Sequence, residues 1–216
     1  MALLGSSKAE QVRSAVDWNK IAEFEGATPE KRLTGYIPQT DGVAIEGSGV
    51  TIGLGVDLGQ HNKHDLKGLP EDLIKKLTPF LELKGQAALN SSFENLKISE
   101  NEVNVLDQHL KAKKTEQVRK AYNNDTGQEF YNLPPDAQTA IMSVYWQHGT
   151  SDPQKAAPNF WGHVTQGNWG GATQELRNWS DKPDYGHQYR RNAEANILAN
   201  LIAPQTPQGL LGLISP

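Results

Sequence analysis

The sequence predicts an α+β protein, in which an N-terminal helix and a small antiparallel β-hairpin or meander lobe are followed by a larger all-helical lobe. Residues 33–59 are rich in glycine with β-branched residues between, a pattern typical of short strands joined by tight turns. Beyond residue 60, apolar residues recur at helical spacing. Clefts commonly form where two such lobes meet, so we expect a cleft between them.

The helices are predicted one by one from their boundaries. Gly26 predicts the end of a first helix over residues 8–25. Ser99 and Glu102 have the spacing of a capping box, which predicts the start of a long helix reaching about Tyr122. A helix over residues 70–83 is expected to be broken early by Pro79. The other helices follow from apolar spacing, and they cover residues 136–149, 160–166, 172–179 and 187–202.

Composition limits the kind of protein. The 216 residues suit one domain, with a small lobe over about 8–65, a helical lobe over about 66–202 and an irregular tail over 203–216. A net charge of −4 argues against nucleic-acid binding, and the absence of cysteine excludes disulfides and thiolate metal sites. No apolar run approaches the roughly 18 residues of a membrane span. We also expect the protein to be a monomer.

The end of the first helix carries a candidate general acid. Glu23 and Glu25 lie two residues apart, so they occupy different faces of the helix. Glu23 follows Asn19 at one helical turn, whereas Glu25 follows Ile21 and, two turns back, Trp18. A carboxyl group against apolar surface loses hydration, which raises its pKa toward the value a general acid needs. The alternative is that Glu25 merely ends a helix.

A second candidate lies on the segment over residues 50–57, which alternates strictly between apolar and other residues. Read as one strand, it places Thr51, Gly53, Gly55 and Asp57 on one face. Glycines weaken a strand, and close approach of a flat saccharide would explain them. Asp57 and Thr51 would then hold a water, as an inverting glycoside hydrolase requires. The alternative is a glycine-rich hairpin in which Asp57 is only a turn residue.

These segments resemble a known family. Glu25-Gly26, the glycine-rich hairpin and Val50-Thr-Ile-Gly-Leu-Gly resemble the phage-type lysozymes of glycoside hydrolase family 24. The longer stretches Gly35-Tyr-Ile-Pro and Val56-Asp-Leu-Gly-Gln are similar to the pesticin-like muramidase domains of that superfamily. The helices at residues 140–149 and 189–195 are more loosely similar, so the resemblance spans roughly residues 20–200.

The resemblance implies a lysozyme-like fold and cleavage of the β-1,4 bond between N-acetylmuramic acid and N-acetylglucosamine. Its catalytic Glu, Thr and Asp fall on Glu25, Thr51 and Asp57. Ordinary phage lysozymes carry the Asp between the Glu and the Thr, so Asp41 and Glu46 remain alternative bases. We expect substrate contacts from Tyr36, Gly53, Gly55 and Gln147, and the reaction implies no cofactor and no metal.

Other polar residues receive structural interpretations. His61 and His64 have no third ligand in view, so solvated histidines are favoured over a metal site. Arg190 and Arg191 are expected to form surface pairs with Glu194 or Asp184. The basic run is expected to be a solvated helix face, and it consists of Lys111, Lys113, Lys114, Arg119 and Lys120.

The expected partner is the glycan strand of peptidoglycan, and a bacteriolytic role leaves room for an immunity or inhibitor protein. The apolar run at residues 2–4 is too short for a signal-peptide core. We therefore expect a phage lysis system, a secretion machine or a translocation domain to deliver the protein to the cell wall in the periplasm. Three alternatives stay open: a silent glycan-binding module, a partner-recruiting structural component that uses the tail, and a lytic transglycosylase.

Overall fold

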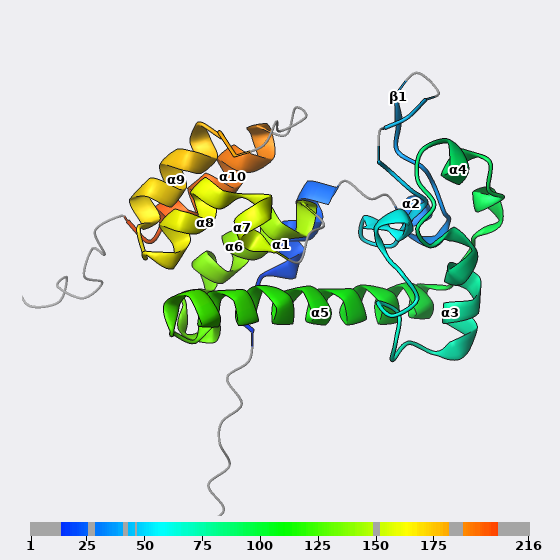
Figure 1. The fold of residues 1–216 in the computed structure, drawn as a ribbon, viewed down its shortest axis with the longest axis horizontal. Helices are drawn as coiled ribbons and strands as arrows, with labels where there is room; N and C mark the ends of the chain where they lie inside the picture. Colours follow the sequence, from blue (N-terminus) through cyan, green and yellow to red (C-terminus); the bar gives the residue numbers. More distant parts are fainter. Residues whose placement is uncertain are drawn as a thin grey trace, which may run out of the picture. The chain divides into compact units, whose positions relative to one another are not determined.

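The computed structural model describes residues 14–25, 29–40, 43–45, 47–148, 152–181 and 188–202, and it confirms the predicted α+β class (Figure 1). The described residues divide into two compact units. One unit is Asp17–Val118, and the other combines the described parts of Met1–Val16 and Arg119–Pro216. Among the described residues, no helix is both long and apolar enough to cross a membrane.

The unit Asp17–Val118 holds all the described strands and the first five α-helices, the last of which continues into the other unit. Figure 1 shows α3, α4 and β1 near the end at which α5 begins. The strands are β1 (Gln39–Thr40), β2 (Val43–Ala44), β3 (Thr51–Ile52) and β4 (Val56–Asp57). The helices are α1 (Trp18–Glu25), α2 (Pro29–Leu33), α3 (Glu71–Leu77), α4 (Gln86–Leu89) and α5 (Glu100–Thr126).

The first helix is shorter than predicted at its start. The described residues 14–17 are not helical, and α1 begins at Trp18. The carboxylate of Asp17 accepts hydrogen bonds from the backbone amides of Asn19 (3.0 Å) and Lys20 (3.2 Å), which caps the helix there. The predicted end at Glu25 is correct, and residues 8–13 lie outside the described part of the chain.

The two-stranded sheet β3–β4 is extended into a larger antiparallel ladder by single bridges. Thr51 pairs with Asp57 on one side and with Tyr36 on the other. Two residues before Tyr36, Thr34 pairs with Lys97, immediately before α5. The short helix α2, which the sequence analysis did not predict, ends at Leu33 and leads directly into this ladder. The ladder therefore joins the segment that follows α2 to β3 and β4 on one side and to the segment that precedes α5 on the other.

Helix boundaries after residue 60 follow the local signals closely. The capping box is confirmed, since the Ser99 amide donates to the Glu102 carboxylate (2.8 Å) and the Glu102 amide donates to the Ser99 hydroxyl (3.3 Å). Pro79 ends α3 early, and a 3₁₀ turn follows over residues 78–80. Residues 66–118, which we expected in the helical lobe, belong to the same compact unit as the hairpins.

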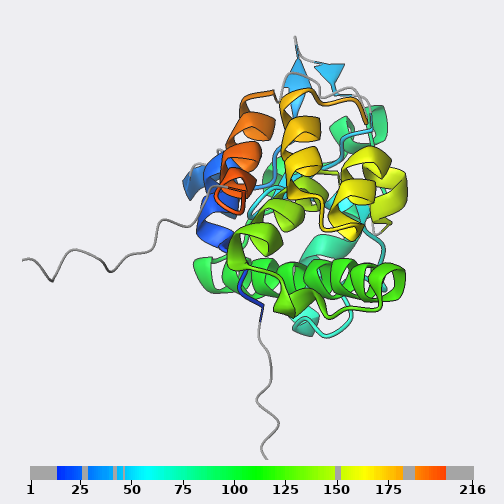
Figure 2. The ribbon, with the colours of Figure 1, turned by 90° about the vertical axis from the view of Figure 1, so that its left-hand side faces the viewer.

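The other unit contains the C-terminal helices. The bounds of α6, α8, α9 and α10 agree with the predicted ones to within about three residues, whereas the short helix α7 is not predicted by the sequence. Helix α10 packs on α9 and on α6, and α8 packs on α9 (Figure 2). The core of this unit is aromatic. The buried rings of Tyr145 and Trp161 are in edge-to-face contact, with their centroids 5.5 Å apart. The helices are α6 (Pro135–Gln147), α7 (Pro153–Ala156), α8 (Pro158–Thr165), α9 (Trp169–Arg177) and α10 (Gln188–Ala199).

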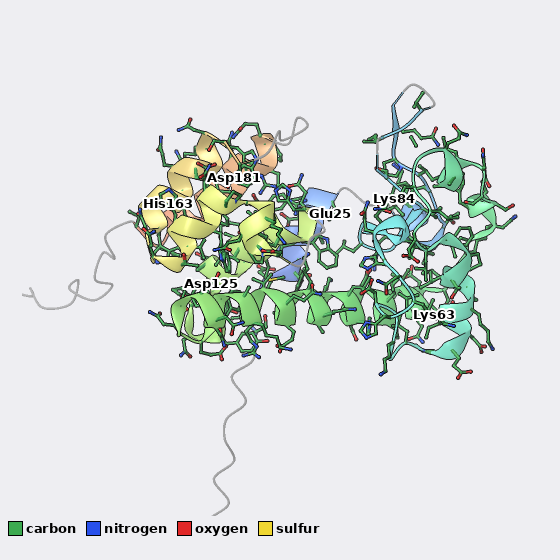
Figure 3. All side chains as sticks on the ribbon, viewed as in Figure 1. Glu25, Lys63, Lys84, Asp125, His163 and Asp181 are labelled. Atoms are coloured by element: carbon green, nitrogen blue, oxygen red, sulfur yellow. The ribbon has the colours of Figure 1, made fainter. Side chains whose placement is uncertain are left out.

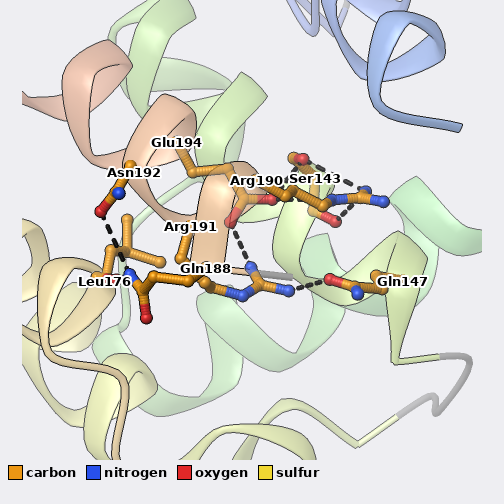
Figure 4. A network of polar contacts seen from close by, with 8 residues as sticks. All are labelled: Ser143, Gln147, Leu176, Gln188, Arg190, Arg191, Asn192 and Glu194. Carbon is orange, nitrogen blue, oxygen red and sulfur yellow. Dashed lines mark hydrogen bonds and ion pairs between the residues drawn. The ribbon is translucent and has the colours of Figure 1, made fainter. Parts of the chain in front are cut away.

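The expected pairing of Arg190 and Arg191 with Glu194 is confirmed, but its expected place at the surface is wrong, because all three side chains are buried in this unit (Figure 4). Glu194 has no exposed surface, and its carboxylate accepts from Arg190 Nε (3.1 Å), from Arg191 Nη1 and from the Ser143 hydroxyl (2.5 Å). Two cations and one carboxylate thus share the interface between α6 and α10. Asp184, the other expected partner, lies outside the described residues.

The interpretation of the basic run on α5 as a solvated face is also largely wrong. Lys113 donates to the Asp65 carboxylate (2.6 Å), and Arg119 donates to the Glu129 carboxylate (3.1 Å). Lys114 is only 8% exposed, and burial lowers its pKa to about 8. Of the five basic residues only Lys120 is exposed, so this stretch of α5 is mostly a packing face.

Candidate functional site

The segment over residues 50–57 is a tight hairpin and not the single strand that the alternation predicts. Ile52 pairs with Val56, and Gly53, Leu54 and Gly55 form the turn between them. Gly53 (φ 64°) and Gly55 (φ 72°) have left-handed backbone conformations that other residues adopt at a cost. The glycines are therefore needed first for the turn. Thr51 and Asp57 still share a face, because they are directly opposite each other in the ladder.

Glu25 lies against this turn. It is the last residue of α1, where Figure 3 labels it, and its side chain is less exposed than that of Glu23. A Cβ atom built on Gly55 would lie only 2.8 Å from Glu25 Oε2. Glycine at position 55 thus leaves room for the Glu25 carboxylate beside the hairpin. Of the apolar residues expected on the same helix face as Glu25, Ile21 is fully buried and Trp18 is half-buried.

Tyr36, Thr51 and Asp57 form a row across the ladder. Tyr36 and Thr51 exchange both backbone hydrogen bonds, at 2.9 and 2.6 Å, and Thr51 is in turn the register partner of Asp57. Directly opposed residues project to the same side of an antiparallel ladder. The structure therefore brings together, on one face, two of the predicted catalytic residues and the predicted substrate contact Tyr36.

The two oxygens of Asp57 have different partners. Oδ1 accepts from the backbone amides of Gly59 (2.9 Å) and Gly49 (3.0 Å), so it caps the following 3₁₀ turn and closes the hairpin. Among the described residues, Oδ2 accepts a single long hydrogen bond, from the Gln60 side chain (3.4 Å). Gln60 is itself held by Lys84, labelled in Figure 3, whose Nζ donates to Gln60 Oε1 at 2.8 Å. Oδ2 is the oxygen with spare capacity to accept a proton or a water.

Thr51 is a buried neighbour of this carboxylate. Its side chain is 4% exposed, and its hydroxyl lies 3.4 Å from the Gly49 carbonyl oxygen, at the limit of a hydrogen bond. A hydroxyl both donates and accepts, so it can support a water that Asp57 also contacts.

The electrostatics of Tyr36 connect the two carboxylates. Burial raises the pKa of the Tyr36 phenol, and the negative charges of Glu25 and then Asp57 raise it further. The phenol therefore lies within electrostatic range of both groups and stays a protonated hydrogen-bond donor at neutral pH. The Lys31 ammonium lies 5.5 Å from the centre of the Tyr36 ring, which fixes the ring by a cation–π contact.

The sequence analysis missed the residues that hold the hairpin turn from behind. Asp107 on α5 is 4% exposed and accepts a hydrogen bond from the Leu54 amide at 3.0 Å. Its other oxygen pairs with Arg32 Nη2 at 3.3 Å. One signal could have revealed it: Asp107 is a lone carboxylate beside Val103, Leu106 and Leu110, on the buried stripe of its helix.

The structure does not place the remaining predicted site residues beside Glu25 and the hairpin. Gln147 belongs to the second unit, where its Oε1 accepts from Arg191 Nη2, so its role toward substrate stays a prediction. The alternative bases Asp41 and Glu46 lie outside the described residues. His61 pairs with Asp65 at 3.6 Å. Within the described ranges, no three His, Cys, Asp or Glu side chains gather as a metal site would require.

The sequence matches a family of known proteins. The family model described as pesticin, a bacterial toxin homologue of phage lysozyme, C-terminal part, matches residues 15–170. That range includes Glu25, the whole hairpin region and helices α1 to α8. No curated protein matches the chain.

Proposed function

Because the chain belongs to the pesticin family of phage-lysozyme homologues, we propose that it is a muramidase that hydrolyses the β-1,4 bond between N-acetylmuramic acid and N-acetylglucosamine. The observation that carries this proposal is the placement of Glu25 against the Gly55 turn, in the same unit as the Tyr36–Thr51–Asp57 row. Two carboxylates that flank a scissile bond are what glycoside hydrolysis requires.

In this mechanism Glu25 is the general acid that protonates the leaving glycosidic oxygen. Its carboxylate lies beside the close-packed turn, and Ile21, one helical turn earlier on α1, is fully buried. Tyr36, which remains a donor near both carboxylates, supports the sugar through a hydrogen bond. No metal or cofactor enters these steps.

Asp57 is the general base in the same proposal. Oδ1 is fixed by two backbone amides, which orients the carboxylate, and Oδ2 then receives a proton from the attacking water. The buried Thr51 hydroxyl holds that water on the face it shares with Asp57. A water that attacks opposite the leaving group gives inversion at the anomeric carbon.

The site of action follows from the substrate. We propose that the protein acts on the cell wall in the periplasm as a bacterial toxin or lysis protein. A phage lysis system, a secretion machine or a translocation domain would deliver it there. What supports the toxin role is the description of the family alone.

The test is digestion of purified peptidoglycan by wild type, Glu25→Gln and Asp57→Asn, with new reducing ends and product mass measured together. Asparagine at position 57 keeps an oxygen that can accept the two backbone hydrogen bonds that Oδ1 accepts in wild type. This variant therefore removes the base and keeps the cap of the 3₁₀ turn. We expect reducing muramic ends from wild type and a loss of at least roughly 100-fold in each folded variant.

Three outcomes would count against the proposal. Anhydro products from wild type would indicate a lytic transglycosylase, and binding without cleavage would indicate a glycan-binding module. Full activity in Asp57→Asn would assign Asp57 to the turn alone. An Asp57→Ala variant separates the two roles further, because it should also lose about 1 kcal/mol of cap stability.

A further inference from the structure

A buried carboxylate outside the proposed catalytic set holds the hairpin turn in place. Asp107 lies near the start of α5 and is 4% exposed. Its Oδ1 accepts from the Leu54 amide at 3.0 Å, in the middle of the turn, and its Oδ2 pairs with Arg32 Nη2 at 3.3 Å. A carboxylate this buried is retained only with good partners, and both partners here belong to the site region.

Arg32 and Asp107 both accept hydrogen bonds from backbone amides of the turn. The Gly53 amide donates to the Arg32 carbonyl oxygen at 3.1 Å, while the Leu54 amide donates to Asp107. A Cβ atom built on Gly53 would lie 2.7 Å from Asp107 Oδ1, so the carboxylate packs directly on the turn. Two hydrogen bonds thus join the turn to Arg32 at the end of α2 and to Asp107 on α5, and the Arg32–Asp107 ion pair joins these two residues to each other.

The same turn is the seat of Glu25. Gly53 contacts Asp107, and Gly55, two residues later, leaves the space that Glu25 Oε2 occupies. A shift of the turn by a few tenths of an ångström would therefore reach the Glu25 carboxylate. Catalysis is sensitive to such shifts, because an acid displaced by about 1 Å can lose roughly 100-fold in rate.

Asp107 also balances charge beside the turn. Lys111 lies one helical turn further along α5, and burial is the main cause that lowers its pKa. The Asp107 charge opposes this lowering and the Arg32 charge adds to it, so the three groups interact. Arg32 of α2 and Lys111 of α5 are therefore cations that interact with Asp107. Glu25 of α1 lies against the same turn, and the charges of Glu25 and Asp57 both act on Tyr36. Without Asp107, the Arg32 and Lys111 charges would lose this acidic neighbour.

We propose that Asp107 is a positioning residue for the general acid: it fixes the Gly53–Gly55 turn against which Glu25 lies, and it neutralises Arg32 beside that turn. This inference rests on the proposed muramidase function. It adds a third carboxylate to the working site, one that acts through the turn and does not touch the substrate.

The test compares Asp107→Asn with wild type by kcat, KM and the pH profile of kcat on solubilised glycan strands. Asparagine keeps an oxygen for the Leu54 amide, so the turn should fold while the charge is lost. The Arg32 and Lys111 charges then lose their acidic neighbour. Because the loss of a nearby negative charge favours the ionised form of an acid, we expect the alkaline limb of the profile to move to lower pH by roughly 0.5 unit. KM should stay within about twofold of wild type.

The control is Glu102→Gln, which removes a carboxylate from the first turn of the same helix. Glutamine preserves the capping box with Ser99, and Glu102 pairs with Lys76 on α3, away from the hairpin turn. This variant should keep the wild-type kcat and pH profile. Asp107→Ala, which removes the Leu54 bond as well, should lower kcat by a further factor of about 10.

A wild-type kcat and alkaline limb in Asp107→Asn would overturn the inference, as would an equal shift in Glu102→Gln. Loss of folding in Asp107→Asn, measured by thermal unfolding, would assign Asp107 to stability and also overturn it. Failure of the proposed function has a different signature, because wild type itself would then release no reducing ends.

Discussion

Replacing Gly55 with alanine tests the geometry of the site most sharply. The residue has φ 72°, and a Cβ atom there would lie 2.8 Å from Glu25 Oε2. A non-glycine residue in this backbone region costs roughly 1–2 kcal/mol. A carbon and an oxygen cannot remain so close, and the flexible end of the Glu25 side chain yields more readily than the backbone. The substitution should therefore displace the proposed acid.

The expected result is a fall in kcat of roughly 10- to 100-fold, because the acid no longer reaches its position. The free energy of unfolding should fall by only about 1–2 kcal/mol, which lowers Tm by roughly 2–8 °C in a chain of this size. Turnover of solubilised glycan and calorimetric unfolding measure the two effects separately.

Gly127→Ala is the matched control. Gly127 has φ 69°, nearly the same as Gly55, and a Cβ atom there would meet nothing within 4 Å. It should show the same loss of stability with unchanged kcat. Equal activity in the two variants, with both folded, would refute the placement of Glu25 against the turn.

Two further predictions concern stability. Lys114→Met should raise the free energy of unfolding at pH 7 by up to about 3 kcal/mol, because the lysine pKa is lowered from 10.5 to about 8 in the folded protein. Because the pKa is lower in the folded state, wild type gains stability as the pH rises from about 8 toward 10.5. The difference in unfolding free energy between Lys114→Met and wild type should therefore shrink between pH 8 and pH 10. A difference that stays constant over this range would contradict the prediction. Glu194→Ala should cost roughly 3–5 kcal/mol, since Arg191 would be left fully buried without its carboxylate, whereas a loss below about 1 kcal/mol in denaturant unfolding would show that the cluster contributes little.

The sequence predicts well what depends on neighbours along the chain. The Ser99–Glu102 capping box, the early stop of α3 at Pro79 and the bounds of the C-terminal helices all follow from local signals, and all are confirmed. The resemblance to the pesticin-like domains, carried by a short glycine-rich stretch, agrees with the family match over residues 15–170.

What the sequence could not give are the features decided by contacts between distant segments. Strict alternation over residues 50–57 fits a strand, but positive φ at Gly53 and Gly55 turns it into a hairpin. Thr51 and Asp57 remain on one face for a different reason, namely their cross-strand pairing. The hydrogen bonds from Arg191 to Gln147 and from the Leu54 amide to Asp107 each join residues more than 40 positions apart, which no local pattern encodes.

The central claim is that Glu25 and Asp57 act on opposite sides of the bond, with water as the nucleophile. The most direct test is the configuration of the newly formed reducing end, read by NMR in the first minutes of digestion by wild type, before mutarotation. The account predicts that the α-anomer of the muramic residue appears first, because attack by water inverts the β-linkage. A first-formed β-anomer would indicate a covalent intermediate, and an anhydro end would show that no water attacks; either result would contradict the role given to Asp57.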